Sequence, residues 1–432
     1  MSGPTTIVWL RRDLRLQDNR ALDTAVSERV PVVLLFIFDP HILGELPGDD
    51  PRITFIYQNL RKIHERLRTW GSSLLIRLGN PEEVWEQLVQ EFTIHHVFAS
   101  RDYEPYAIRR DESIARLLKK RGIPARFVKD QVIFERDEVS KPDGEPYTVF
   151  TPYKKRWLDR YNLISKEIRP EPDSSAFEKN DWPFPAIEEI GFRSATQQVA
   201  PPDFSRIRNY DRYRDLPALE GTTLAGPHLR FGTVSIRELA IRAEQENPVY
   251  LSELIWREFF MQILWHFPEV VTQSFRKAYD TIRWRNDDGE FDRWCKGETG
   301  YPLVDAGMHQ LNRTGFMHNR VRMVVASFLC KHLLIHWSWG EAYFAQKLLD
   351  YELSSNNGNW QWAAGTGCDA APYFRVFNPT LQQERFDPHL DYTRQWIPGF
   401  NPARYILPMV DHSAARVRAI QTYRAALSPG TR

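Results

Sequence analysis

The sequence has little cysteine and no long hydrophobic run. Only three cysteines occur in 432 residues, at positions 295, 330 and 368. They are too few and too widely spaced for a disulfide framework or a four-thiolate cluster. The longest apolar run, residues 30–38, has the length of a strand and is too short to cross a membrane. No basic segment with a cleavage site opens the chain. These absences predict a reducing, intracellular setting, no bound metal and no membrane partner.

The chain also lacks an excess of charge of one sign. Lys and Arg number 57 and Asp and Glu 56, which gives a formal net charge of +1. A nucleic-acid partner would therefore need a local basic patch. Aromatic residues, in contrast, make up 13% of the chain and include 14 Trp. Such a content indicates a large flat ligand or a dense aromatic core, and the length favours two domains.

Short apolar runs alternate with helical patterns in the first third of the chain. The runs predict buried strands at Thr6–Leu10, Pro31–Phe38, Ser73–Leu78, His95–Ser100 and Arg126–Lys129. Strand–helix alternation at this spacing predicts a doubly wound, parallel five-stranded sheet in an α/β domain over residues 1–132. No G-x-G-x-x-G fingerprint follows the first strand. The segment Arg11–Arg15 either binds an anion or caps the sheet edge, and the sequence leaves both open.

The pattern changes twice after this domain. Residues 133–206 are rich in proline and predict an interdomain connector. Residues 207–432 predict an all-α domain, with helices at Ser235–Glu246, Pro248–Phe267, Phe291–Lys296, Pro302–Thr314, Asn319–His336 and Trp339–Leu349. We interpret Asn356–Pro379 as a loop, because it is rich in glycine, asparagine and aromatic residues.

Two of the expected helices carry polar groups that suit a site. Glu253, Trp256 and Arg257 share one face of their helix. A carboxylate on an apolar helix is costly to bury without a partner, so this face either meets solvent or forms a site. Asn319 and Met323 lie one turn apart on a second helix, where a methionine fills a core or contacts a ligand.

Three tryptophans and one loop complete the candidates. Trp360, Trp337 and Trp284 are separate core residues or, if they stack in series, a path for an electron. The loop Glu220–Pro227 bears glycines and hydroxyl groups, and its backbone N–H groups suit phosphates.

Four long motifs and the start of the chain resemble one family. The motifs are Glu253–Glu258, Gly300–Ala306, Met317–Met323 and Asn356–Pro379, and the opening is Trp9–Asn19. Together they resemble the photolyase/cryptochrome flavoproteins, most closely the class I cyclobutane pyrimidine dimer photolyases. The resemblance covers essentially the whole chain in the expected order, and its motifs are highly specific.

The resemblance implies that the helical, C-terminal domain binds FAD in a bent form. Asn356 would face flavin N5, and Trp360, Trp337 and Trp284 would form a photoreduction chain from inside to outside. Ala225 replaces a usual hydroxyl residue, and Glu352 stands where Asp is common. A second, antenna chromophore is left open: a deazaflavin, a folate, a second flavin or none. The implied cofactor contacts are Tyr210, Thr222, Thr223, Leu224, Ala225, Gly226, Arg257, Arg322, Asp350, Glu352 and Asn356.

The implied function is light-driven repair of cyclobutane pyrimidine dimers in DNA, with an electron supplied by photoexcited reduced FAD. The enzyme would be a carbon–carbon lyase that acts as a cytoplasmic monomer, nucleoid-associated in a bacterium, on a flipped-out dimer. The alternative is a cryptochrome-type blue-light photoreceptor without repair. The implied catalytic residues are Glu253, Asn319, Met323, Trp256 and Trp362. The implied DNA contacts are Arg214, Glu253, Trp256, Asn319, Arg320, Arg375 and Gln382.

Overall fold

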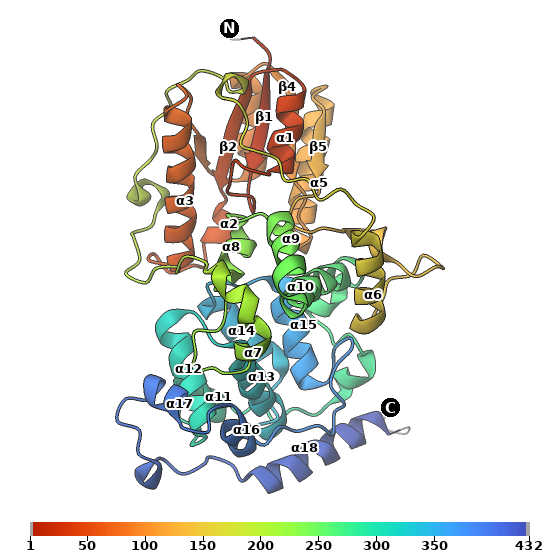
Figure 1. Cartoon of the computed structure of the whole chain (residues 1–432), viewed down its shortest axis with the longest axis vertical. Helices are drawn as coiled ribbons and strands as arrows, with labels where there is room; N and C mark the ends of the chain where they lie inside the picture. Colours follow the sequence, from red (N-terminus) through yellow and green to blue (C-terminus); the bar gives the residue numbers. More distant parts are fainter. Residues whose placement is uncertain (1–2, 429–432) are drawn as a thin grey trace. The chain divides into compact units, whose positions relative to one another are not determined.

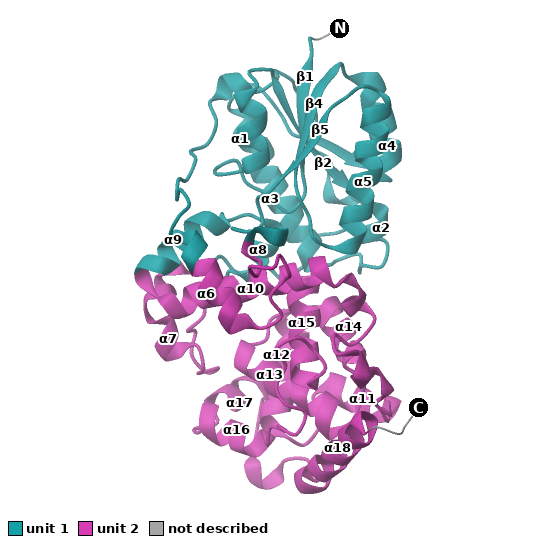
Figure 2. Ribbon diagram, turned by 90° about the vertical axis from the view of Figure 1, so that its right-hand side faces the viewer, with its two compact units in different colours: residues 1–138, 159–202, 224–245 teal, residues 139–158, 203–223, 246–432 magenta. Residues whose placement is uncertain are grey.

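The computed structural model describes residues 3–428 (Figure 1). Contacts within the chain divide it into two compact units (Figure 2). Unit 1 comprises residues 1–138, 159–202 and 224–245, and unit 2 comprises residues 139–158, 203–223 and 246–432. Both units take part of the proline-rich region. The division into residues 1–132, 133–206 and 207–432 stays a prediction.

Unit 1 contains a five-stranded sheet with the strand order β3-β2-β1-β4-β5. Every pair in it is parallel, and Val8 in the central strand lies opposite Leu34 on one side and Phe98 on the other. The predicted doubly wound parallel sheet is therefore confirmed. The strands are β1 (Thr5–Leu10), β2 (Val32–Phe38), β3 (Leu75–Leu78), β4 (Ile94–Ser100) and β5 (Ala125–Val128).

Helices cover both faces of this sheet (Figure 2). Successive side chains of β1 alternate between two cores: Val8 packs with α1 (Arg20–Ser27) and α3 (Pro51–Arg68), and Trp9 with α4 (Pro81–Glu91) and α5 (Pro105–Lys120). Burial on both faces explains why β1 and β2 read as continuous apolar runs. The edge strands β3 and β5 were expected to be buried as well, but most of their residues are partly exposed. A short helix, α2 (Pro40–Leu43), follows β2.

The arginines after β1 cap the sheet edge. Arg12 Nη1 lies 3.3 Å from Asp102 Oδ1 and 3.2 Å from Glu104 Oε1. Arg15 Nη2 lies 2.7 Å from Asp130 Oδ2. Of the two readings left open by the sequence, the structure shows capping, because carboxylates of the chain itself pair with these guanidinium groups.

Unit 2 is helical, as predicted, with a core in which α12 and α13 are central. No helix in the described part of the chain is long and apolar enough to span a membrane. Two further helices, α8 (Gly226–Phe231) and α9 (Ile236–Glu246), lie in or at the end of the last segment of unit 1. The helices of unit 2 include α6 (Phe150–Tyr161, as far as residue 158), α7 (Tyr210–Tyr213), α10 (Pro248–His266), α11 (Asp288–Lys296), α12 (Pro302–Thr314), α13 (Asn319–Ser327), α14 (Trp337–Lys347), α15 (Leu353–Ala364), α16 (Pro379–Phe386), α17 (Asp391–Trp396) and α18 (His412–Leu427).

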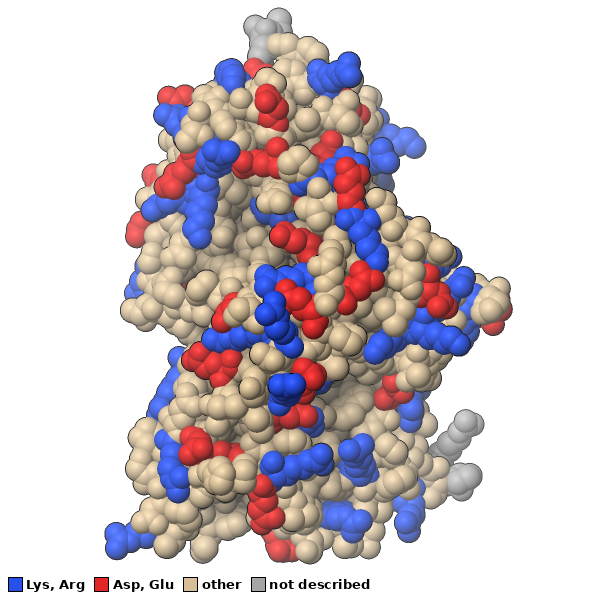
Figure 3. Space-filling view, viewed as in Figure 1, with Lys and Arg blue, Asp and Glu red and all other residues tan. Residues whose placement is uncertain are grey.

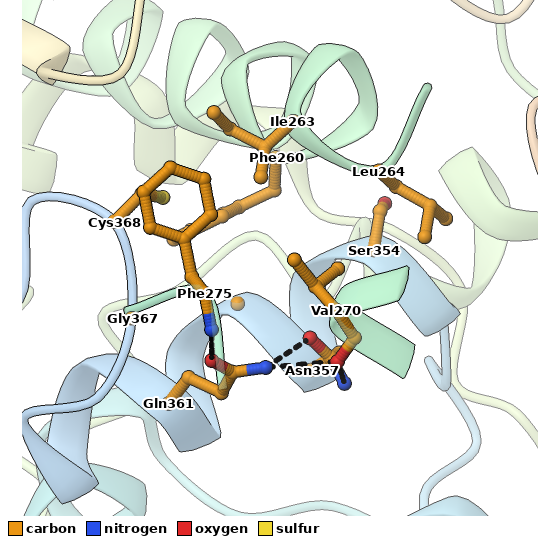
Figure 4. Close-up of a pocket in the computed structure, with 11 residues that line it drawn as sticks. Phe260, Ile263, Leu264, Val270, Phe275, Ser354, Asn357, Gln361, Gly367 and Cys368 are labelled. Carbon is orange, nitrogen blue, oxygen red and sulfur yellow. Dashed lines mark hydrogen bonds between the residues drawn. The ribbon is translucent and has the colours of Figure 1, made fainter. Parts of the chain in front are cut away.

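The interpretation of Asn356–Pro379 as a loop is wrong at its start, where the chain forms α15. Gly358 is needed for helix packing, since a Cβ there would lie 2.2 Å from Cδ1 of Phe260 on α10. Asn357 and Gln361 donate through their side-chain amides to Val270 O at 3.0 and 2.9 Å (Figure 4). Local propensity misleads here, because glycine and amide residues serve contacts with distant parts of the chain.

The helix predicted over residues 319–336 is interrupted. After α13 the chain forms a π-helical turn at Phe328–His332, and Leu334 then takes a φ of +52°. Trp337 consequently begins α14, two residues before the start of the helix predicted at Trp339–Leu349. All residues from 328 to 335 are buried, and six of these eight are apolar; the other two are Lys331 and His332. A continuous apolar pattern therefore hides the break.

Candidate functional site

A cavity in unit 2 collects many of the residues singled out in the sequence. It contains about 610 Å³ of empty space, part of it open to solvent. Its walls come from α13, α14, α15 and the segment between the last two. The predicted residues that line it are Asn319, Arg322, Met323, Asp350, Glu352, Asn356, Trp360 and Trp362. Two stretches that are separate in sequence, residues 319–326 and 344–363, thus meet around one space.

Helix α15 supplies one wall of this cavity through a single face. Asn356, Trp360 and Ala363 line it at the spacing of one helical turn. The opposite face, with Asn357 and Gln361, is hydrogen-bonded to the chain after α10 (Figure 4). These bonds fix the rotation of α15 and so determine which side chains meet the cavity.

The amide of Asn356 has a defined orientation. Its Nδ2 donates to the backbone oxygen of Glu341 at 3.0 Å and to Glu341 Oε1 at 2.8 Å. Burial raises the pKa of Glu341, and the hydrogen bond from Asn356 acts in the opposite direction. Both amide hydrogens are engaged, so Oδ1 remains as the acceptor. Sequence reasoning missed Glu341, because only the packing of α14 on α15 brings it to Asn356.

Two ion pairs border the cavity. Arg322 Nη2 lies 2.9 Å from Asp350 Oδ2, and Arg257 Nη2 lies 3.1 Å from Glu352 Oε1. The side chain of Glu352 is 6% exposed, so the guanidinium of Arg257 compensates a nearly buried carboxylate. This pair also connects the cavity wall to α10.

The face of α10 that was predicted as a site carries an ion pair between Glu253 and Arg214. Glu253 Oε1 accepts a hydrogen bond from Arg214 Nη1 at 2.6 Å. Burial raises the pKa of Glu253, while Arg214 and Lys154 act against that shift. The net effect is a raised pKa, so Glu253 takes up a proton more readily than an exposed glutamate does. Tyr210 lies beside it, with the guanidinium of Arg214 5.4 Å from its ring.

Trp256 stacks on a residue that the sequence did not indicate. The rings of Trp256 and Phe150 are 3.6 Å apart between centroids and 8° from parallel. Phe150 begins α6, and its backbone N–H donates to Asp369 Oδ2 at 3.1 Å. Phe150 and Lys154 were missed because they lie in the proline-rich region that we had treated as a connector. The sequence did contain a signal for this helix, because a proline such as Pro152 is common in the first turn of a helix.

The three predicted chain tryptophans differ in burial. Trp360 and Trp337 are 2% and 1% exposed, and Trp284 is partly exposed. Trp360 packs closely on α14, since a Cβ on Gly340 would lie 2.1 Å from its Cη2. Trp337 begins the same helix. Among the described rings, none of the three tryptophans is in direct ring contact with another, and His336 contacts both Trp337 and Trp284.

The predicted phosphate loop does not gather in one unit. Thr222 and Thr223 belong to unit 2, where Thr223 Oγ1 is 2.8 Å from Tyr250 Oη. Leu224, Ala225 and Gly226 belong to unit 1. Leu224 has a φ of +55°, a conformation that side chains rarely adopt. The structure thus shows an unusual backbone at this loop.

The predicted DNA contacts lie at different depths. Arg320 Nη2 pairs with Asp215 Oδ1 at 2.6 Å. Arg375 is exposed, Gln382 is partly exposed, and Phe374 beside Arg375 is 58% exposed. On the face drawn in Figure 3, acidic and basic side chains are interspersed, with basic ones gathered over α6.

Comparisons with known proteins match most of the chain. A family model described as DNA photolyase matches residues 6–173, and one described as the FAD binding domain of DNA photolyase matches residues 250–403. The deoxyribodipyrimidine photo-lyase of Halobacterium salinarum is 36% identical over 481 aligned positions, which cover 97% of this chain and 99% of that protein.

Two solved structures share the fold. A bacterial class III photolyase from Agrobacterium tumefaciens has a TM-score of 0.87 and 32% identity, and covers 99% of this chain and 98% of that one. An archaeal photolyase from Sulfolobus tokodaii, solved with two FAD molecules, has a TM-score of 0.83 and 32% identity, and covers 98% of this chain and all of that one.

Proposed function

This chain belongs to the DNA photolyase family, and from that premise we propose that it is a deoxyribodipyrimidine photo-lyase. It repairs cyclobutane pyrimidine dimers in DNA by light-driven electron transfer. The observation that carries the proposal is the cavity of unit 2, in which Asn319, Met323 and Asn356 meet beside two tryptophans. The subclass within the family stays a prediction.

The donor set of the cavity fits FAD. The guanidinium of Arg322, the carboxylate of Asp350 and the amide of Asn356 offer hydrogen bonds to a polar ring edge or a ribose. Asn356 Oδ1 is the free acceptor suited to a protonated ring nitrogen, because Glu341 engages both amide hydrogens. Arg257 and Glu352 complete this set. When bound and photoexcited, reduced FAD supplies the electron that splits the dimer.

The loop Glu220–Pro227, in which the chain passes from unit 2 to unit 1, is proposed to bind the phosphates of the cofactor. Its hydroxyl and backbone N–H groups suit anionic oxygens, and the family resemblance supports this assignment. The residues proposed for the phosphates are Tyr210 on α7 together with Thr222, Thr223, Leu224, Ala225 and Gly226 of the loop.

The lesion is recognised by groups on α10, α13 and α15. Burial raises the pKa of Glu253, which favours uptake of a proton that it would share with a pyrimidine carbonyl as negative charge develops there. Trp256, backed by Phe150, and Trp362 offer ring faces to the flipped-out bases. Asn319 adds a second hydrogen-bonding group, and Met323 an apolar contact.

The DNA backbone is held by arginines and one amide. Arg214, Arg320 and Arg375 contact phosphates, which adds affinity without sequence preference, and Gln382 extends this surface. The exposed ring of Phe374 suits insertion beside the flipped-out pair, as apolar side chains do in distorted duplexes.

Oxidised cofactor is reactivated through tryptophans. Trp360 would give one electron to the bound cofactor. Trp337 would then give an electron to Trp360, and Trp284 an electron to Trp337. Trp284 is partly exposed, so it can be re-reduced by a thiol from solution.

An antenna chromophore remains open between a deazaflavin, a folate, a second flavin and none. The archaeal relative with two FAD molecules favours a flavin as the first candidate to test. We further propose that the protein acts as a cytoplasmic monomer, bound to the nucleoid in a bacterium.

A repair assay separates the enzyme from the cryptochrome-type photoreceptor. Protein with fully reduced FAD is mixed with an oligonucleotide that contains one thymine dimer and is illuminated with blue light. Repair restores absorbance in the thymine band, and a dark sample is the control. If absorbance does not recover while dimer DNA is bound, the photoreceptor is the correct reading.

A further inference from the structure

The imidazole of His336 lies between two tryptophans of the proposed electron chain. Its ring centroid is 5.2 Å from that of Trp337 and 5.2 Å from that of Trp284. The ring planes make angles of 33° with Trp337 and 76° with Trp284. Among the described rings, His336 and Tyr423 contact Trp284, and of these two only His336 also contacts Trp337. A charge that moves between the two indoles therefore passes beside this imidazole.

Hydrogen bonds hold His336 from both sides. Its Nδ1 accepts the backbone N–H of Ser338 at 3.2 Å and lies 2.7 Å from Ser338 Oγ, so His336 is the N-cap of α14. Its own backbone N–H donates to Oδ1 of Asn286 at 2.8 Å. Asn286 follows Trp284 by two residues. The imidazole thus keeps its place relative to both indoles.

The protonation state of this ring is set by its surroundings. Because Nδ1 accepts a backbone hydrogen bond, the neutral ring carries its hydrogen at Nε2, and a second proton must displace that bond. Burial lowers the pKa of His336, and Asp280 acts in the opposite direction. Burial is the larger effect, so the ring is neutral near pH 7 and becomes charged only in acid.

Few other charges face the ring. Arg285, in the same turn as Trp284, pairs with Glu290 of α11 through two hydrogen bonds of 2.8 Å. The first charged residue of α14 itself is Glu341, which is engaged with Asn356. On the side of α18, the nearest ring to Trp284 is the buried Tyr423. Among the described residues, Asp280 is the charged group that acts on His336, so protonation would add a positive charge that one nearby carboxylate partly offsets.

We propose that His336 controls electron flow through the tryptophan chain: the neutral imidazole lets a positive hole leave Trp360 for Trp337 and Trp284, and the imidazolium opposes this step because it repels a hole on either outer indole. The inference rests on the proposed function of these tryptophans. A radical cation on either indole is repelled by a second positive charge whose ring centre is 5.2 Å away.

The electrons balance without a redox role for His336. Trp360 gives one electron to the cofactor, Trp337 refills Trp360, and Trp284 refills Trp337. Trp284 releases its indole proton to water and finally takes an electron and a proton from a thiol in solution. His336 gains and loses no electron, and acts only through its charge and position.

The test follows photoreduction of the FAD-loaded, oxidised protein in blue light with dithiothreitol, from about pH 5.5 to about pH 8. The variants are His336→Asn and His336→Asp, because both residues cap a helix well and neither can become positive. Wild type should lose rate in acid, with a midpoint below the ordinary histidine value of about 6.5. At about pH 5.5 both variants should be faster than wild type by roughly threefold or more.

A second readout does not depend on photoreduction. The histidine ring-proton signal that disappears from the NMR spectrum of His336→Asn should titrate in wild type with the midpoint of the rate profile. Variants that keep the acid loss of wild type, or an NMR midpoint that differs from the rate midpoint, would overturn the inference.

The variant Trp360→Phe distinguishes a failure of the proposed tryptophan chain from a failure of the role of His336. Photoreduction that survives in Trp360→Phe contradicts the tryptophan chain and with it the proposed function of these residues. Photoreduction lost in Trp360→Phe, together with an unchanged acid profile in His336→Asn, contradicts the role of His336 alone.

Discussion

At the scale of single residues, Glu253 combines two demands that usually conflict. It pairs with Arg214 at 2.6 Å, yet burial leaves its pKa raised. Burial makes Glu253 easier to protonate than an exposed glutamate, and the guanidinium of Arg214 gives its carboxyl group a hydrogen-bonding partner. Arg214 therefore matters twice, as a candidate phosphate contact and as the partner that limits the proton affinity of Glu253.

Replacing Glu253 should affect repair and spare cofactor binding. Glu253→Ala removes the hydrogen bond to the lesion and should lower the quantum yield of repair by roughly tenfold. Glu253→Gln keeps a donor and should stay within about threefold of wild type. Repair is measured with pre-reduced protein, and the flavin content by absorbance. Equal losses in both variants would contradict a hydrogen-bonding role.

Glu341 should control the redox preference of the cofactor through Asn356. Glu341→Leu removes the side-chain acceptor and leaves only the backbone oxygen of residue 341, so the amide is held less firmly. Nδ2 can then replace Oδ1 at the cavity more often, and reduced cofactor should reoxidise in air roughly several-fold faster. Glu341→Gln retains an acceptor for Asn356 and serves as the matched control. Reoxidation is followed by flavin absorbance. The role assigned to Glu341 fails if the leucine variant reoxidises at the rate of the control.

Residue identity alone did not reveal such partners. Glu253 and Trp256 could be named as candidates from the sequence, because an acid and an indole stand out on an apolar helix. Glu341, Phe150 and His336 could not, because each gains its role from a contact with a residue distant in sequence. Their positions follow from how helices pack, which the local pattern does not contain.

At the scale of elements, α15 depends on a close approach to α10. Gly358→Ala would place a Cβ 2.2 Å from the ring of Phe260, and we expect a loss of about 1–3 kcal/mol in the free energy of unfolding. Gly289→Ala on the exposed start of α11, whose Cβ would approach nothing closer than 3.4 Å, is the control. It should leave stability unchanged or raise it by about 0.5–1 kcal/mol. Urea unfolding measures both, and an equal effect of the two substitutions would refute the packing argument.

The elements themselves were predictable to different degrees. All five strands were found. The central strands β1 and β2 are buried on both faces and appear directly as apolar runs, and the partly exposed edge strands β3 and β5 were found from shorter runs. Helix α15 was missed, because its glycine and amides are typical of loops when their distant partners are unknown. The break at Leu334 was missed for the opposite reason, since buried residues on both sides continue the apolar pattern.

At the scale of the whole molecule, a net charge of +1 leaves DNA binding to local groups. Arg375→Ala should weaken binding to damaged and undamaged DNA alike, and should reduce the slope of log affinity against log salt by about 0.9. The control is Arg116→Ala on α5 of unit 1, where the arginine side chain is 66% exposed. It should change neither the affinity nor the slope. Fluorescence anisotropy at several salt concentrations measures the slope. A loss confined to damaged DNA would assign Arg375 to the lesion and not to the backbone.

One helix, α15, carries Asn356, Trp360 and Trp362 within two turns. The residue proposed to tune the flavin, the first electron donor and one wall of the lesion pocket therefore share a single rigid support. Any substitution that slides or rotates this support alters colour, charge separation and substrate grip together. An engineer who wants to adjust one of these properties must keep the backbone of α15 still and vary only what its side chains touch.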